Sequence, residues 1–205
     1  MQNTIVYLIR HSTPEHPIKA GQPTMYGPDA PLITAAGRLK AQKLCSDLIS
    51  REGKPFDVIY SSPFKRAFET ASILAEKALQ KKVNVIEGLR DTISDWPGTP
   101  MDELAQIADA GQLFNDPRTH ETVAEIAERM NTAFHQIVSA NPGLLIGVVS
   151  HGDPLRILYD RIRHPDQEIR AYLQLVREFS LGQAQGLRLE IDSAGRIEIA
   201  PDPAG

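Results

Sequence analysis

The chain has 205 residues, with 22 basic and 26 acidic side chains and a formal net charge of −4. This length fits one domain over residues 1–205, which is large enough to bury a core without stabilisation by a disulfide. Cys45 is the only cysteine, which excludes an internal disulfide and a thiolate zinc cage. No basic stripe, signal peptide or membrane-length apolar run stands out. We therefore expect a cytoplasmic protein that binds neither nucleic acid nor membrane.

The predicted elements alternate between strands and helices. Apolar, β-branched runs predict buried strands at 5–9, 55–61, 83–86 and 144–150. Helical periodicity predicts helices at 34–52, after 61–63, at 101–110, at 121–140 and after residue 151. Residues 186–199 alternate around a turn, as in an antiparallel hairpin. This order is typical of an α/β protein with a mostly parallel sheet and an antiparallel edge hairpin.

The boundaries of two helices depend on particular residues. Thr34 is expected to cap the first helix, which carries apolar residues such as Leu39 and Leu48 and ends near Gly53. The segment 61–63, Ser-Ser-Pro, is expected to cap the second helix, with proline in its first turn.

Two histidines follow two of the predicted strands. Arg10 and His11 end the first strand, and His151 ends the most continuous apolar run of the chain. The carboxyl ends of parallel strands form the edge of the sheet where ligands bind. If the two strands are neighbours, these residues converge there, joined by Arg66 from the start of the second helix.

Two permanent cations and two imidazoles form a strong anion site, and phosphate is the natural ligand. The imidazole of His11 can attack phosphorus and carry the phosphoryl group. The arginines would neutralise its equatorial oxygens, and His151 would bind an oxygen. Gly152 begins a helix whose backbone N–H groups would add donors. None of these steps requires a metal or another cofactor.

One carboxyl group is still needed to protonate the leaving alcohol and later to activate water. Asp91 is the best candidate by its place in the chain, followed by Asp95, Glu15 and Asp153.

A zinc site is the chemical alternative for two histidines and a carboxylate. Arginines next to the ligands would repel a metal ion, and the chain has no HExxH or similar spacing. The sequence therefore favours the phosphate site.

Several segments resemble, in order, the signatures of the histidine phosphatase superfamily, which includes phosphoglycerate mutases and many small phosphatases. They are Tyr7–Ser12, Pro31–Gly37 with Ala41-Gln42, Tyr60–Ala71, Glu121–Arg129 and Val148–Gly152. The resemblance covers nearly the whole chain. It implies a three-layer αβα sandwich and a metal-independent phosphatase of the histidine acid phosphatase type. It also implies a phosphohistidine at His11, phosphate binding by Arg10, Arg66 and His151, and a small phosphorylated substrate.

The chain departs from the family pattern at two places. Ser12 replaces the glycine after the first histidine, which narrows the phosphate pocket or adds a hydroxyl donor to it. The usual glutamate of the proton-donor segment corresponds to Asp91, with one residue fewer before Trp96. A shorter side chain on a shorter loop changes the reach of the donor.

Three functions remain after this reading of the sequence. A phosphomonoesterase is the first, and a phosphoglycerate-type mutase and a phosphate-binding module without turnover are the alternatives. Tyr26, Trp96 and His120 are candidates for the wall of the specificity pocket, with ordinary packing as the alternative. The sequence predicts neither the substrate nor the oligomeric state.

Overall fold

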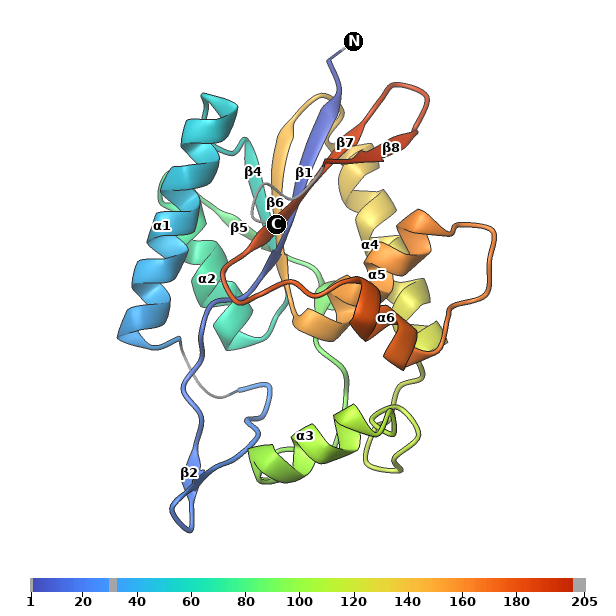
Figure 1. Cartoon of the computed structure of the whole chain (residues 1–205). Coiled ribbons are helices and arrows are strands. Elements are labelled where there is room, and N and C mark those ends of the chain that lie inside the picture. Colours follow the sequence, from blue (N-terminus) through green and yellow to red (C-terminus); the bar gives the residue numbers. More distant parts are fainter. Residues whose placement is uncertain (1, 30–32, 201–205) are drawn as a thin grey trace.

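The protein is described by a computed structural model covering residues 2–29 and 33–200, with a six-stranded sheet at its centre (Figure 1). Pro31 and Leu32 of the second matching segment lie outside the described residues. The strand order is β5-β4-β6-β1-β7-β8. The four parallel strands are β1 (Thr4–Arg10), β4 (Val58–Ser61), β5 (Val83–Val85) and β6 (Leu145–Ser150). The hairpin β7 (Gly186–Ile191) and β8 (Ile197–Ile199) completes one edge in antiparallel pairing.

Helices cover both faces of this sheet, which confirms the predicted three-layer α/β sandwich (Figure 1). One face is covered by α1 (Ala35–Glu52) and α2 (Lys65–Ala75), and the other by α4 (Val123–Ala140), α5 (Gly152–Arg163) and α6 (Tyr172–Glu178). The central strands read as continuous apolar runs because both of their faces are buried. In β1, Val6 and Leu8 face α4 and α5, whereas Tyr7 and Ile9 face α1 and α2.

The structure shows which side of the first helix is buried and corrects the start of the second. Leu39 is 67% exposed, because the buried face of α1 consists of Gly37, Ala41, Cys45 and Leu48. The second helix begins at Lys65, later than predicted. Its delayed start has a physical reason, since the backbone N–H of Ser62 still donates to the carbonyl of Val149 and prolongs the pairing of β4 with β6.

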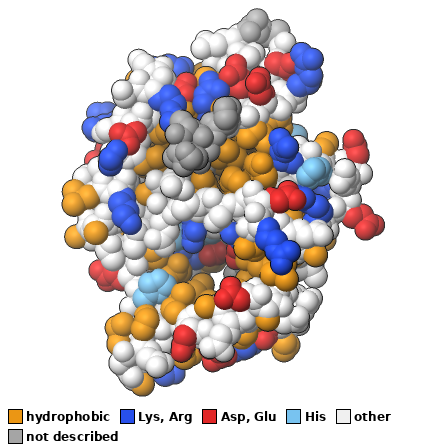
Figure 2. All heavy atoms as spheres, in the orientation of Figure 1, with side chains coloured by type: hydrophobic (Ala, Val, Ile, Leu, Met, Phe, Trp, Pro, Cys, Tyr) orange, Lys and Arg blue, Asp and Glu red, His pale blue; other side chains and the backbone are white. Residues whose placement is uncertain are grey.

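A second group of elements lies beyond the carboxyl ends of the parallel strands (Figure 1). It contains the two-stranded β2 (Ile18–Lys19) and β3 (Gln22–Pro23) and the helix α3 (Met101–Asp109). The turn η1 (Glu87–Leu89) instead packs against α4, with Leu89 in the core. Figure 2 shows a hollow between this group and the sheet, with charged side chains inside it and apolar side chains on its rim. Among the described residues, no helix has the length and apolar character that crossing a membrane requires.

Candidate active site

The register between β1 and β6 places the two histidines side by side. Arg10 is opposite Ser150 in the parallel ladder, and the N–H of His11 donates to the carbonyl of Ser150 at 2.9 Å. The next residue of each chain segment is therefore a histidine, and the two rings lie 5.1 Å apart between centroids. The strand ends thus converge as the sequence predicts.

The ring of His11 is held in one tautomer. Its Nδ1 lies 2.7 Å from the carbonyl oxygen of Ser12. A carbonyl only accepts, so Nδ1 carries the hydrogen and Nε2 keeps its lone pair. Burial, together with the charge of Arg66, lowers the pKa of His11 to about 4. The ring is consequently neutral at neutral pH, with a nucleophilic nitrogen available.

Ser12 and Gly37 fix the backbone that follows His11. The Ser12 hydroxyl donates to the carbonyl of Gly37 at 2.6 Å, and the Ser12 N–H donates to the hydroxyl of Thr70 at 3.0 Å. A Cβ on Gly37 would stand 2.5 Å from the carbonyl oxygen of Thr13, so only glycine fits there. The hydroxyl of Ser12 is thus directed toward α1 in this structure, and its contribution to phosphate binding stays a prediction.

Arg66 is buried and forms an ion pair with Asp91. The distance from Nη2 to Oδ2 is 2.7 Å, and the guanidinium also lies over the ring of Tyr26, 4.6 Å from its centroid. Burial opposes ionisation of Asp91, but the charge and the hydrogen bond of Arg66 overcome it and hold the pKa of this carboxyl well below its usual range. Asp91 is therefore a carboxylate in the free site.

His151 faces the same carboxylate from the other strand. Its Nδ1 lies 3.3 Å from Oδ2 of Asp91, without the alignment of a hydrogen bond, and its Nε2 lies 2.8 Å from the hydroxyl of Ser62. Burial lowers the pKa of His151 well below its usual value. A neutral ring with its Nδ1 hydrogen toward Asp91 accepts the Ser62 hydroxyl at Nε2.

Arg10 reaches the site from the end of β1. Its Nη1 donates to the carbonyl of Leu181 at 2.9 Å, and a Cβ on Gly152 would lie 3.2 Å from its Cζ. Glycine thus lets the guanidinium approach the beginning of α5. Within the described residues, Nε of Arg10, Nε of Arg66 and Nδ1 of His151 are buried without a hydrogen-bond partner. A bound oxyanion would accept hydrogen bonds from these three unpaired nitrogens.

The other carboxylate candidates have different surroundings. Glu15 is exposed, Asp95 pairs with His120 at 2.8 Å, and Asp153 accepts hydrogen bonds from Arg156 and Tyr172. The structure brings only Asp91 of these four into contact with Arg66 among the described residues.

The three residues suggested for the wall of the specificity pocket lie in different places. Trp96 is buried and donates from Nε1 to the hydroxyl of Thr119, and it lines a cavity next to Asp91. Tyr26 lines a neighbouring cavity together with Arg66. His120 lines neither cavity, and its side chain is 44% exposed.

Comparison with known proteins identifies the family of the chain. Residues 6–193 match the family model of the histidine phosphatase superfamily (branch 1). The chain belongs to the histidine phosphatase superfamily. It is 33% identical over 150 residues to phosphoglycerate mutase-like protein 4 of Arabidopsis thaliana, covering 69% of this chain and 64% of that protein's length. It is 29% identical over 163 residues to phosphoserine phosphatase 1 of Hydrogenobacter thermophilus, covering 74% of this chain and 72% of the relative.

Solved structures of the superfamily share the fold. YhfR of Bacillus stearothermophilus superposes with a TM-score of 0.75 at 24% identity, covering 97% of this chain and 96% of YhfR. A phosphoserine phosphatase mutant of Entamoeba histolytica in complex with phosphoserine superposes with a TM-score of 0.73 at 21% identity, covering 97% and 95% of the two chains. At this identity the likeness establishes the fold alone.

A buried ionic network holds the segment that carries Asp91. Glu121 accepts from Nη2 of Arg90 at 2.6 Å and from Nε of Arg129 at 2.9 Å. The guanidinium of Arg129 also donates to the backbone carbonyls of residues 88, 90 and 91. No role for these residues follows from the sequence alone, although Glu121 and Arg129 lie in one of the matching segments. The signal in the sequence for this ion pair is an acidic and a basic residue eight positions apart on one predicted helix.

We expect Arg129→Met to lower the free energy of unfolding by roughly 3–5 kcal/mol, because it leaves the Glu121 carboxylate buried with one cation fewer. Adding Glu121→Gln should recover part of this loss. Urea unfolding followed by circular dichroism measures both. Arg196→Met is the control, since the Arg196 side chain is 85% exposed in its pair with Asp192. Equal unfolding free energies for Arg129→Met and Arg196→Met would contradict the structural role of the network.

Proposed function

We propose that the protein is a phosphatase that hydrolyses a phosphomonoester through a phosphohistidine at His11. The observation that carries this proposal is the neutral His11 ring, whose Nδ1 is fixed on the carbonyl of Ser12. A fixed tautomer leaves Nε2 as the only nucleophilic nitrogen of the ring. The unpaired nitrogens of Arg10, Arg66 and His151 surround it and favour an oxyanion.

In the first step, Nε2 of His11 attacks phosphorus. The P–N bond forms while the bond from phosphorus to the ester oxygen breaks, and the electron pair goes to the leaving oxygen. Arg10 and Arg66 neutralise the equatorial oxygens, and His151 donates its Nδ1 hydrogen to one of them. The backbone N–H groups at the start of α5, beginning with Gly152, add positive potential.

The leaving oxygen takes its proton from Asp91 in this proposal. Because Arg66 keeps Asp91 ionised in the free site, the proton has to arrive with the substrate. A phosphomonoester bound as its monoanion brings one proton. Once Arg66 turns to the phosphoryl oxygens, its hold on Asp91 weakens and the pKa of the carboxyl rises, so that Asp91 accepts the proton and delivers it to the alcohol.

The second step returns the site to its initial state. Asp91, now a carboxylate, takes a proton from a water molecule, and the water oxygen attacks the phosphorus of the phosphohistidine. The P–N bond breaks, its electron pair returns to Nε2, and phosphate leaves with the proton that Asp91 has received. No metal ion takes part in this sequence, and the protein's own cations supply the neutralisation.

We expect release of phosphate from p-nitrophenyl phosphate in the presence of EDTA, and its loss by about three orders of magnitude or more in His11→Ala. Rapid acid-free quenching with a radiolabelled phosphomonoester should trap label on the wild-type protein, stable in alkali and labile in acid. His135→Ala, an exposed histidine on α4, is the matched control. Turnover that survives His11→Ala overturns the mechanism, and transfer without net phosphate release indicates the mutase. Binding without either indicates the phosphate-binding module.

Asp91→Asn should reduce kcat according to the leaving group. For an alkyl phosphate we expect a loss of about 10²- to 10³-fold, because the alkoxide needs a proton. For p-nitrophenyl phosphate the loss should be much smaller, since nitrophenolate leaves without one. Steady-state kinetics with both substrates measures the ratio, and Asp95→Asn is the control carboxylate, with its side chain 73% exposed. Equal losses with the two substrates would remove Asp91 from the role of proton donor.

The pH dependence of kcat/KM should show an acidic limb near pH 4. His11 attacks only when neutral, and its pKa in the free protein is lowered to about 4, so activity falls as pH drops through that value. Activity should fall again above about pH 6, where a phosphomonoester loses its second proton and becomes the dianion. Initial rates from pH 3 to 8 in buffers of constant ionic strength test this profile. An acidic limb centred above pH 6 would contradict a neutral, buried His11.

A further inference from the structure

The helix α3 has an apolar face that the core does not cover. Met101, Leu104, Ala105 and Ala108 recur at the spacing of one helical face, and no residue of α3 is buried. None of the three core clusters of the described residues includes a residue of this helix. Short amphipathic helices are stabilised mainly by packing of that face, so the apolar side of α3 lacks the contact that such helices normally have.

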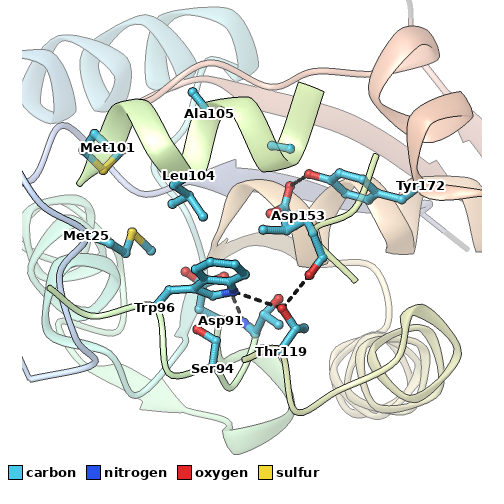
Figure 3. A pocket seen from close by; sticks show the side chains of 13 residues that line it. Met25, Asp91, Ser94, Trp96, Met101, Leu104, Ala105, Thr119, Asp153 and Tyr172 are labelled. Carbon is cyan, nitrogen blue, oxygen red and sulfur yellow. Dashed lines mark hydrogen bonds between the residues drawn. The ribbon is translucent and has the colours of Figure 1, made fainter. Parts of the chain in front are cut away.

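This face forms one wall of a cavity of about 230 Å³ (Figure 3). Trp96 lies across from the helix, and Leu104 projects from α3 toward it (Figure 3). The apolar part of the lining consists of Met25, Trp96, Met101, Leu104, Ala105, Ala108 and Leu113. A cavity enclosed mostly by apolar side chains gains from apolar surface placed inside it.

Asp91 connects the cavity to the phosphate site. It lines this cavity, and it also lines the neighbouring one that contains Arg66 and Tyr26. Its carboxylate is in contact with Arg66 at 2.7 Å. A phosphoryl group held by Arg66 would thus have Asp91 beside its ester oxygen and the space under α3 beyond. The alcohol part of a bound phosphomonoester would therefore extend into this cavity.

The charges around the cavity are unfavourable for a second anion. Among the described residues no lysine, arginine or histidine lines it, and its only ionisable acids are Asp91 and Asp153. The carboxylate of Asp153 is occupied by Arg156 and by the hydroxyl of Tyr172.

The cation behind Trp96 is also engaged. Arg118 stacks on Trp96, 3.9 Å from the ring centroid, and its nitrogens pair with Glu103 and Asp116 at 2.9 Å each. A carboxylate brought in by the substrate would lose its hydration next to two acids whose own cations, Arg66 and Arg156, are already paired.

Building on the phosphatase activity proposed above, we propose that the cavity under α3 binds the alcohol part of the substrate and selects apolar alcohols without negative charge. Phosphomonoesters of aliphatic or aromatic alcohols fit this description. Phosphorylated amino acids and phosphorylated hydroxy acids, whose carboxylates would lie under α3, do not fit it.

Binding of three alkylphosphonates tests the proposal without any turnover, because their P–C bond is not hydrolysed. The probes are ethylphosphonate, hexylphosphonate and 6-phosphonohexanoate, titrated into the wild-type protein by isothermal titration calorimetry. Each buried methylene is worth about 0.8 kcal/mol, so even partial burial of the longer chain predicts that hexylphosphonate binds at least about tenfold tighter than ethylphosphonate. The terminal carboxylate of 6-phosphonohexanoate should cancel this gain.

Leu104→Lys places an ammonium group in the apolar wall and should reverse the preference. We expect it to bind 6-phosphonohexanoate more tightly, and hexylphosphonate more weakly, each by about tenfold. Leu104→Gln, polar but uncharged, should lose hexylphosphonate without gaining the carboxylate. Leu39→Lys adds the same charge on the exposed side of α1 and should change neither affinity. Ala105→Lys, at an exposed position of the same lining, repeats the test should Leu104→Lys not fold.

The results separate the two proposals. Equal affinity for ethylphosphonate and hexylphosphonate, or tighter binding of 6-phosphonohexanoate by the wild type, overturns the selection of apolar alcohols even in an active phosphatase. Tight binding of hexylphosphonate with no hydrolysis of hexyl phosphate supports the selection and counts against the phosphatase. Preferential hydrolysis of hexyl phosphate over 6-phosphohexanoate supports both.

Discussion

The parallel pairing of β1 with β6 is the constraint on which the site depends. Arg10 is opposite Ser150, and this register alone brings His11 and His151 to the same point of the sheet edge. Each strand is buried on both faces, and a shift of one residue would exchange the side chains that face α1 with those that face α4. The packing of the core therefore fixes the distance between the two rings, and the polar groups of the site inherit their positions from apolar residues remote from the chemistry.

The free site contains buried charged and polar groups that are incompletely paired. Burial keeps His11 and His151 neutral, whereas Asp91 stays ionised against Arg66, and several nitrogens around them have no partner in the described residues. Such groups cost stability until an anion satisfies them. The same imbalance is useful for transfer of a phosphoryl group, because the stabilisation is released where negative charge develops. Arg66 pairs with Asp91 in this structure, and in the proposed mechanism it turns to the phosphoryl oxygens.

The sequence predicts the parts of the structure that follow from local pattern. The apolar runs locate β1 and β6, Thr34 and Gly53 delimit α1, and the histidines at the strand ends indicate an anion site. What it does not predict depends on distant contacts. The tautomer of His11 requires knowing where the carbonyl of Ser12 points. The support of Asp91 by Arg129 joins residues 38 positions apart. The periodicity of the sequence carries no such information. Only the family resemblance places Asp91 and Arg129 in segments with a function.

In the proposed function, phosphate and the alcohol are recognised by different parts of the fold. The phosphate site is built on strand ends that the core holds rigidly, whereas the cavity beyond Asp91 is closed by α3, which contributes nothing to the core clusters of the described residues. Substitutions on α3 can therefore change the lining with little cost in stability, while substitutions at the strand ends cannot. Members of the superfamily named for phosphoserine share this sheet at low identity. A shared fold does not by itself fix the substrate, and in the proposal made above the residues under α3 select it.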